Sequence, residues 1–358
     1  MDHTCIFEFW KPDMRIALDA MGGDNAPAAL VQGGLEAAKY AAGALEIVFV
    51  GDRVRLEQEI SRHPLLTRGD KAHFSIHHAS EKIEMSDVPT IALKKKKDAS
   101  VLVAARLHRE GKVDAIVSAG HTGAAMAASL LELGRIRGVK RPGIGSLIPN
   151  GYGVTMLIDV GANVDCKSLH LVQFGMMGSI FMNRVIGIES PKVALLSNGE
   201  ERSKGTEVTR EAYRLLEQSQ VNFIGNVEGR DILKGSADVV VCDGFVGNVI
   251  LKFAESLGGV FRHHIKRQIG KQIFRQIGAF LLKPTFAGLR KIFDYEEYGG
   301  APLLGINGVC IICHGGSTPK AIRNAIREAK KMVSEGITQI IGQELQIFNG
   351  VKVVEPEV

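Results

Sequence analysis

The chain has 358 residues, of which 45% are hydrophobic and 23% charged, as in ordinary globular proteins. Its net charge of +5 is too small to indicate nucleic-acid binding, but it would suit an acidic partner or an anionic surface. Five mostly isolated cysteines are typical of a reducing compartment. Residues 1–13 contain acidic groups and no long apolar run, which argues against a secretory signal. We therefore predict an extension before a domain that begins at Met14, with Met14 itself an alternative start.

Apolar runs typical of buried parallel strands alternate along the chain with helical patterns. The expected strands are 15–20, 45–51, 114–120, 154–161, 192–199, 221–227, 238–244 and 308–315. The expected helices are 28–42, 52–62, 98–110, 123–137, 168–187, 205–219, 246–282 and 319–347. This order predicts a mainly parallel sheet with helices on both faces. We find no repeat and no linker, so we expect one domain over 14–347 and a tail over 348–358.

Polar, glycine-containing segments follow seven of the expected strands, where ligands of open parallel sheets bind. The segments are "DAMGGD" (19–24), "SAGHTGA" (118–124), "DVGANVD" (159–165), "SNGEERSKG" (197–205), "GNVEGRD" (225–231), "CDGFVGN" (242–248) and "CHGGS" (313–317). Any one of them could be a simple turn. Together they predict the rim of an active site.

The segment after the third expected strand has the composition of an anion-binding loop. Gly120 and Gly123 allow the backbone to approach a ligand, and Thr122 can cap the following helix. Free N–H groups and the helix dipole favour an anion there, phosphate above all. His121 lies within the same loop. The alternative is a capped helix start without a ligand, and the segment lacks the lysine of a Walker motif.

Further candidates follow later strands. Lys204 could hold phosphate or stabilise an oxyanion, although a solvated loop is the alternative. Asp243 stands at a strand end, and Asn248, at or inside a helix start, could donate to a carbonyl oxygen; the alternative is an N-cap. His314 could reach a ligand or form a structural hydrogen bond.

The first polar segment provides one wall of the predicted pocket. Gly22 and Gly23 let the backbone approach a ligand. Asp19 and Asp24 would repel phosphate, so we expect them to orient donors or meet a cation. Asn163 is expected to shape the same pocket.

Several chemistries find no support in the sequence. "CIICH" (310–314) matches a haem-attachment pattern, but we interpret its cysteines as small apolar residues of a buried strand, because no export signal precedes them. A second cysteine pair for zinc is lacking, and so are a G-x-S-x-G elbow and a G-x-G-x-x-G fingerprint. We therefore expect no metal and no cofactor, and the positioning of an anion without a covalent enzyme intermediate.

Residues 256–293 contain no Asp or Glu and combine basic side chains with helically spaced apolar ones. This composition is typical of a helical hairpin on a membrane surface, with a break at Lys283–Pro284. A helix pair packed on the core or on a dimer partner is the alternative. The expected membrane-contacting residues are Ile269, Ile273, Phe274, Ile277 and Phe280. A second basic run, 94–98, could meet an acidic protein or be a solvated loop.

The polar segments, together with "IDVGANVDCK" and "YGGAPLLG", resemble the bacterial phosphate acyltransferases (the acyl-ACP:phosphate acyltransferase or PlsX family) from about Met14 to about Gln346. The resemblance implies a Rossmann-like three-layer α/β/α fold, similar to phosphotransacetylases and isopropylmalate dehydrogenases, and a homodimer. It implies transfer of an acyl group from acyl carrier protein (ACP) to inorganic phosphate. The product would supply a membrane glycerol-3-phosphate acyltransferase, which fits a cytoplasmic protein bound peripherally to the membrane.

On this basis Lys204 and Asn248 are the expected catalytic residues, and Gly120 to Gly123 the expected phosphate site. The family usually has Asn at the positions of His121 and Thr206, so the role of His121 is open and Thr206 could serve as a helix cap. A hydroxy-acid dehydrogenase on the same fold and a non-enzymatic membrane scaffold are the rival hypotheses.

Overall fold

The computed structural model describes residues 13–41, 43–63, 73–270, 272–282 and 295–350. The strands are β1 (Met14–Asp19), β2 (Leu45–Gly51), β3 (Phe74–His78), β4 (Ala115–Ser118), β5 (Gly143–Pro149), β6 (Val154–Ile158), β7 (Lys192–Leu196), β8 (Asn222–Val227), β9 (Val239–Val241), β10 (Ala301–Leu304) and β11 (Cys310–Ile312). The helices are α1 (Ala28–Tyr40), α2 (Arg53–Ser61), α4 (Pro89–Lys95), α5 (Ser100–Arg109), α6 (Thr122–Leu133), α7 (Ser168–Phe181), α8 (Glu207–Glu217), α9 (Gly229–Lys234), α10 (Gly244–Ile269), α11 (Ile273–Leu281), α13 (Pro319–Ser334) and α14 (Ile337–Gly350). A π-helical turn, η1 (Met182–Ile186), follows α7, and a 3-10 turn, η2 (Tyr295–Tyr298), precedes β10.

All eight expected strands are present, and the polar segments follow their ends. The sequence patterns missed β3, β5 and β10 and the short helices α4 and α9. Two expected helices are each divided at a glycine of positive φ. The first division is at Gly270 (φ 54°), between α10 and α11, and the expected break at Lys283–Pro284 lies outside the described residues. The second is at Gly336 (φ 62°), and α14 continues to Gly350, past the expected end at 347.

One sheet contains all eleven described strands, in the order β3-β2-β1-β4-β11-β10-β5-β6-β9-β7-β8. Seven of its ten pairings are parallel, as the sequence predicted. The antiparallel pairings join β11 to β10, β10 to β5 and β5 to β6. Because the chain direction reverses at each of these three pairings, strands β1 to β4 and β11 run in one direction. Strands β6 to β9 run in the opposite direction. The sheet therefore has two parallel halves, joined by β10 and β5.

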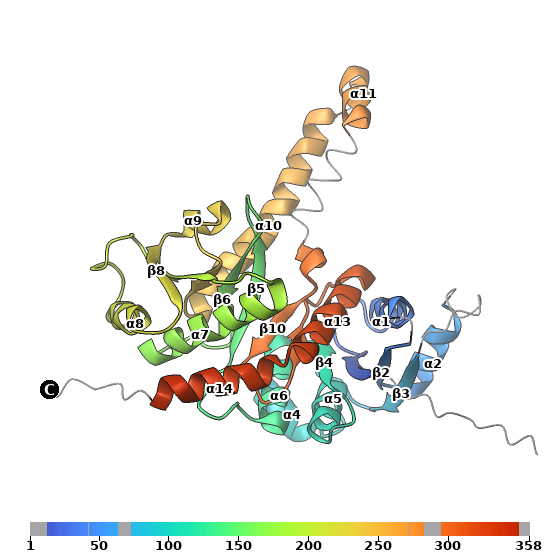
Figure 1. Ribbon diagram of the computed structural model, residues 1–358. Coiled ribbons are helices and arrows are strands. Elements are labelled where there is room, and N and C mark those ends of the chain that lie inside the picture. Colours follow the sequence, from blue (N-terminus) through green and yellow to red (C-terminus); the bar gives the residue numbers. More distant parts are fainter. Residues whose placement is uncertain (1–12, 42, 64–72, 271, 283–294, 351–358) are drawn as a thin grey trace, which may run out of the picture.

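Alternating apolar residues divide the core into two clusters, one on each face of the sheet. In β1, Ile16 and Leu18 belong to one cluster and Ala17 to the other. Helices α1, α7, α8, α13 and α14 contribute to the first cluster, and α4, α5, α6 and α9 to the second. Successive side chains of a strand point to opposite faces, so strands that are apolar throughout must be covered on both sides. The result is the expected three-layer α/β/α fold (Figure 1).

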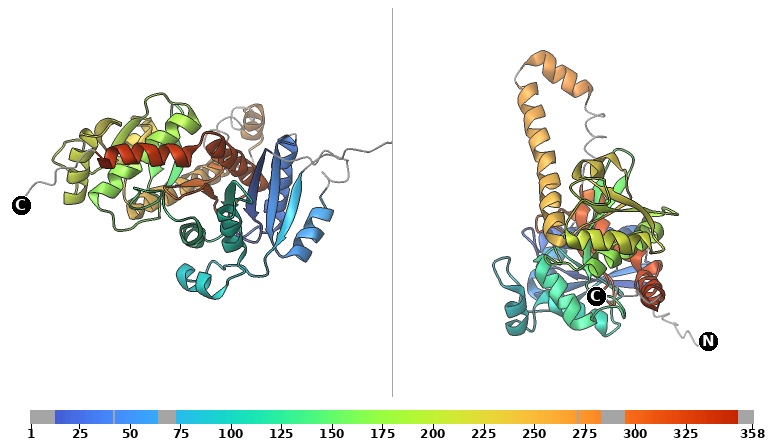
Figure 2. Two further views of the ribbon diagram at one scale, coloured as in Figure 1. Left: turned by 60° about the horizontal axis from the view of Figure 1, so that its bottom comes forward. Right: turned by 90° about the vertical axis from the view of Figure 1, so that its left-hand side faces the viewer.

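Helix α10 extends well beyond this layered body. Its first turns pack on the second core cluster through Ile250 and Leu251. The rest of the helix rises away from the sheet, and α11 lies at its far end (Figure 1; Figure 2, right). No described helix is both long and apolar enough to cross a membrane.

Candidate active site

Asp19, the last residue of β1, is the centre of the first polar group. Its side chain is buried and accepts hydrogen bonds from the hydroxyls of Ser100 (2.6 Å) and Ser118 (2.7 Å). The backbone amides of Met21 and Gly22 also donate to it. Burial raises the pKa of Asp19, and these hydrogen bonds oppose the rise because they favour the charged form. The carboxylate thus holds the two hydroxyls and the two amides in place at the end of β1.

Glycines allow three strand ends to meet beside Asp19. A Cβ on Gly22 would come within 2.6 Å of Asp19 Oδ2 and 2.8 Å of the Gly120 nitrogen. A Cβ on Gly23 (φ +102°) would come equally close to the carbonyl oxygens of Ala119 (2.8 Å) and Gly315 (2.9 Å). Any larger residue would clash with backbone at both positions. The two glycines are therefore required because the three strand ends pack closely against one another. The sequence instead suggested the approach of a ligand as the reason for them.

Asp24 and His314 lie on the exposed side of this group. The Asp24 amide donates to the Gly315 carbonyl (2.8 Å), and the Asp24 carboxylate lies beside Gly315. His314 is exposed, and its Nδ1 accepts a hydrogen bond from the Gly316 amide (3.0 Å). His314 thus makes a structural hydrogen bond while its ring remains open to solvent.

Helix α6 begins one residue before the position we predicted. His121 is the N-cap, and its Nδ1 accepts a hydrogen bond from the Gly123 amide at 3.1 Å. Thr122 is the first helical residue and is exposed, so the prediction that it caps the helix is wrong. The Gly120 amide donates to the Ser118 hydroxyl at 3.2 Å. The amides of Gly120 and Gly123, both in the predicted anion loop, therefore already have protein partners. The Gly123 amide could bind an anion only if the His121 side chain moved away.

A small pocket opens between this loop and the segment before α4. Its floor is polar, with Asp19, Ser100 and Ser118, and its rim carries Lys82 and His121. The remaining lining residues are Gly22, Ile83, Val101, Gly120 and Ala124. Lys82 forms an ion pair with Glu84 (2.9 Å), and both floor hydroxyls donate to Asp19, so a small anion bound here would have to compete with these partners.

The "CIICH" residues have the structural role that the sequence predicted. Cys310 and Cys313 are buried in and just after β11. Burial raises the pKa of the Cys310 thiol to about 11 and that of Cys313 further, so both stay protonated and unreactive at neutral pH. Within the described ranges, no three His, Cys, Asp or Glu side chains are grouped so that they could hold a metal ion.

A second polar group is built around Asp159, which directly follows β6. This buried carboxylate accepts hydrogen bonds from the amides of Ile144, Gly161, Ala162 and Asn163 at 2.7–3.2 Å. The Asn163 side chain donates to Asp159 (2.8 Å) and to the Pro142 carbonyl (2.7 Å). Burial raises the pKa of Asp159, and these donors oppose it. Asn163 therefore anchors Asp159 and the loop after β6, and it is not an open pocket wall.

Asp243 and Asn248 belong to this second group. The Val246 amide donates to the Asp243 carboxylate (2.9 Å), so Asp243 caps α10. Asn248 is exposed one turn further along, with its side chain about 3.8 Å from the position of a Cβ on Gly161. Its amide is thus available at the carboxyl end of β6, where a donor to a ligand oxygen would be placed.

Lys204 lies in the loop between β7 and α8. Its side chain is exposed, packs beside Gly199 and forms no ion pair within the described residues. Thr206 is the N-cap of α8 and accepts from the Thr209 amide at 3.2 Å, which confirms its expected capping role. Strands β6 and β7 share a direction, so Lys204 and Asn248 follow the same ends of the second parallel half.

The sequence patterns did not single out four residues that shape these groups: Lys82, Ser100, Ser118 and Asp159. A polar residue that ends an apolar strand was a usable signal for Ser118 and Asp159. Ser100 and Lys82 come from segments outside any strand end, so spacing could not have linked them to Asp19.

The sequence of this chain is similar to those of known proteins over most of its length. Residues 14–340 match the family described as "Fatty acid synthesis protein". The chain belongs to this family. It is 49% identical over 333 residues to the phosphate acyltransferase of Pelotomaculum thermopropionicum, covering 93% of this chain and 95% of that protein. It is 50% identical over 335 residues to the phosphate acyltransferase of Heliobacterium modesticaldum, covering 93% and 98%.

Solved structures agree with the family fold. A phosphotransacetylase from Streptococcus pyogenes aligns with a TM-score of 0.59 and 18% identity, covering 89% of this chain and 94% of that one. A branched-chain phosphotransacylase from Enterococcus faecalis gives 0.54 and 15%, covering 89% and 99%. At such identities the likeness shows the fold alone, and it confirms the predicted similarity to phosphotransacetylases.

Proposed function

We propose that this chain is a phosphate acyltransferase that moves a fatty acyl group from ACP to inorganic phosphate, releasing acyl phosphate for phospholipid synthesis. The observation that carries the proposal is the 49% identity to a phosphate acyltransferase over 93% of the chain. The acyl phosphate would be consumed by a membrane glycerol-3-phosphate acyltransferase. No second function has a comparable observation in its favour, since the dehydrogenase hypothesis rests on fold alone.

The proposed reaction needs one positioned nucleophile and one polarised carbonyl. A phosphate oxygen attacks the thioester carbon, the C–S bond breaks, and the carrier thiolate leaves and takes up a proton. Phosphate is already an anion at neutral pH, so the protein supplies mainly position and charge stabilisation. We place phosphate over the pocket at Gly120–Gly123, with Lys82 on its rim, and assign the developing oxyanion to Lys204 and Asn248.

The exposure of both proposed oxyanion donors supports this assignment. Lys204 and Asn248 both follow the carboxyl ends of the second half of the sheet, and both present polar atoms to solvent. Asp19, Asp159 and Asn163 form hydrogen bonds within the protein and are proposed to hold the loops in place.

The test is acyl transfer measured by trapping acyl phosphate with hydroxylamine. Lys204→Ala and Asn248→Ala should each lower kcat about 100-fold, because each removes a donor to the oxyanion. The matched control is Lys192→Ala, an exposed lysine at the opposite end of β7. Rates within about threefold of wild type for both variants would overturn the site assignment, and a wild-type chain that makes no acyl phosphate would overturn the function.

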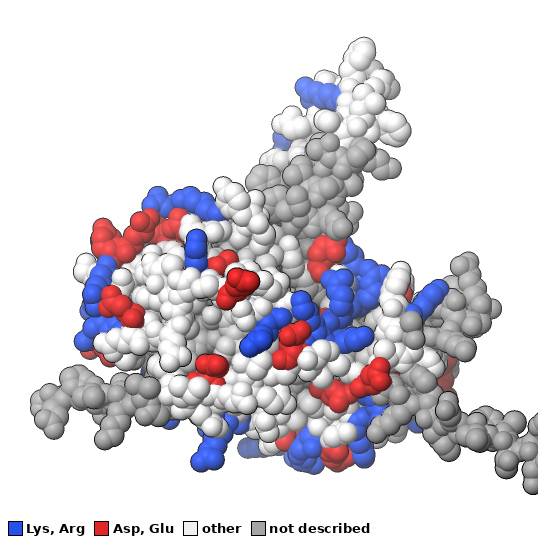
Figure 3. Space-filling model, viewed as in Figure 1, with Lys and Arg blue, Asp and Glu red and all other residues white. Residues whose placement is uncertain are grey.

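Association with the inner face of the cell membrane and with a second copy of the chain is part of the proposal. Helix α11 exposes several large apolar side chains: Phe274, Ile277, Phe280 and Leu281. In the view of Figure 3 the described part of this tip shows uncharged and basic residues and no acidic ones. Near the body, α10 exposes Phe245, Val249 and Phe253 at a spacing of four, which supports a partner surface.

A further inference from the structure

We propose that α4 and the turn before it form the docking surface for the acidic carrier protein that brings the acyl group. The inference rests on the proposed function, because that function supplies the carrier as acyl donor. The α4 surface consists of Met85, Val88, Ile91, Lys94, Lys95 and Lys97.

The centre of the α4 surface is apolar and open to solvent. Met85, Val88 and Ile91 are 57%, 58% and 52% exposed. Ala92 and Leu93, on the other side of α4, are buried in the core. The helix thus buries one apolar face and leaves a second apolar group in water, which is common where a protein meets a partner.

Lysines flank this apolar centre, and they divide into two kinds. Lys94, Lys95 and Lys97 are exposed and make no ion pair within the described part of the chain. Lys96 instead donates to Asp87 (2.6 Å) and to the Lys82 carbonyl (3.1 Å), which fixes the turn before α4. Three charges are therefore free to meet an acidic partner, and a fourth holds the surface in shape.

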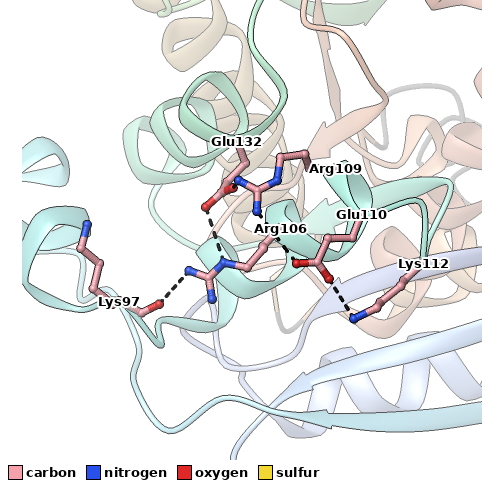
Figure 4. A network of polar contacts seen from close by, with 6 residues as sticks. All are labelled: Lys97, Arg106, Arg109, Glu110, Lys112 and Glu132. Atoms are coloured by element: carbon pink, nitrogen blue, oxygen red, sulfur yellow. Dashed lines mark hydrogen bonds and ion pairs between the residues drawn. The ribbon is translucent and has the colours of Figure 1, made fainter.

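The basic groups behind this surface form ion pairs, unlike those on it. Arg106 and Arg109 of α5 both pair with Glu132 of α6, and Arg106 also donates to the Lys97 carbonyl (3.2 Å). Figure 4 shows the Lys97 carbonyl directed toward Arg106 while its amine points away from the network. The local excess of positive charge thus lies on the lysines, and charge complementarity selects an acidic partner.

The α4 surface lies beside the proposed phosphate site. Pro89, the first residue of α4, is 3.1 Å from the position of a Cβ on Gly123, at the start of α6. Lys82 and Ile83, from the same segment, line the pocket. A helix of seven residues is about 10 Å long, so the lysines at its end are close to the loop. A carrier seated here would bring its thioester arm to the pocket.

The decisive variant is Lys94→Gln/Lys95→Gln/Lys97→Gln, compared with the control Lys192→Gln/Lys330→Gln/Lys331→Gln, which changes the net charge equally. We expect the first variant to raise the KM for palmitoyl-ACP, and the Kd for the carrier by calorimetry, about tenfold, with kcat and the KM for phosphate unchanged. The control should stay within twofold. Added salt should weaken carrier binding in wild type far more than in the first variant.

Further measurements separate docking from catalysis and from membrane binding. With a small acyl-pantetheine thioester as donor, wild type and both variants should be equally active. If the Kd and KM for the carrier are unchanged in the first variant, the α4 surface is not the docking site. This conclusion holds even if the enzyme is fully active. Lost binding to anionic vesicles with an unchanged carrier Kd would also overturn it, because the lysines would then serve the membrane. A wild type that is inactive with every donor would instead overturn the proposed function, and the calorimetry would still test docking.

Discussion

Asp19 and Asp159 are buried carboxylates in the two halves of the sheet, and each is balanced by donors from its own neighbourhood. Asp19 accepts from two serine hydroxyls and from backbone amides, and Asp159 from four amides and the Asn163 side chain. A buried charge is costly unless it is hydrogen-bonded in this way. Both carboxylates therefore help to fix the loops at the strand ends where they lie.

Glu328, in α13, is a buried carboxyl group with far weaker compensation, since only the nearby Gly300 amide and the charge of Arg327 favour its ionised form. It is 9% exposed, and neither oxygen has a hydrogen-bond partner among the described residues. Burial raises its pKa from 4.5 to about 8. The folded state then binds more protons than the unfolded state between these values, so this residue's contribution to stability is lost as pH rises from about 4.5 through 8.

We predict that Glu328→Gln stabilises the protein at pH 8.5 by on the order of 1 kcal/mol or more and has progressively less effect toward pH 5, because the amide cannot ionise. Urea unfolding at several pH values measures this. Glu335→Gln, at the exposed end of the same helix, is the control and should leave the pH dependence as in wild type. A gain that is equal at pH 5 and 8.5 would contradict the prediction.

His121 caps α6 at the proposed phosphate site, because its Nδ1 accepts a hydrogen bond from the Gly123 amide. That amide is therefore bound within the protein, and a ligand at the start of α6 would have to displace the His121 ring to reach it.

At the scale of elements, the two ends of α10 have different surroundings. Its first turns are capped by Asp243 and packed on the core, so they hold Asn248 in place. Its far end carries α11, where Phe274 is 85% and Phe280 73% exposed. Ile277 is 50% exposed and Ile269 is partly buried, whereas the side chain of Ile273 lies outside the described residues.

We predict that Phe274→Asp/Phe280→Asp weakens binding to anionic vesicles about tenfold or more, because two large apolar side chains no longer enter the interface. Activity on soluble substrate should survive. Co-sedimentation with vesicles measures the effect, and Leu131→Asp/Ile347→Asp, which alters exposed apolar residues of α6 and α14, is the control. Equal binding of wild type and the first variant would exclude α11 as the membrane contact.

Sequence patterns located some of these elements and missed others. Central strands such as β1, β4 and β9 are apolar on both faces, and periodicity located all of them. Strands β5 and β10 contain glycine or proline and pair antiparallel, so they lack that pattern and were missed. At the site, motif residues were located but their partners were not. The bonds from Ser100 to Asp19 and from Gly123 to His121 depend on how distant or turning segments meet, which spacing does not encode.

On the scale of the whole molecule, the reversal across β10 and β5 separates the strand ends into two sets. The sequence predicted one mainly parallel sheet and one rim of polar segments, because consecutive β–α units usually share a direction. The sheet is single, but its halves run in opposite directions. Asp19, His121 and His314 thus belong to the first half, and Asn163, Lys204 and Asn248 to the second.

This arrangement has a consequence for how such an enzyme can change. In the proposed chemistry the first half holds the nucleophile, and the second half polarises the acyl group. The two specificities are then carried by separate sets of loops, each anchored on its own buried aspartate. Substitutions in the loops of the second half could then alter how the acyl group is polarised without touching the nucleophile site, whereas substitutions near α4 would affect both the nucleophile site and the proposed docking of the carrier.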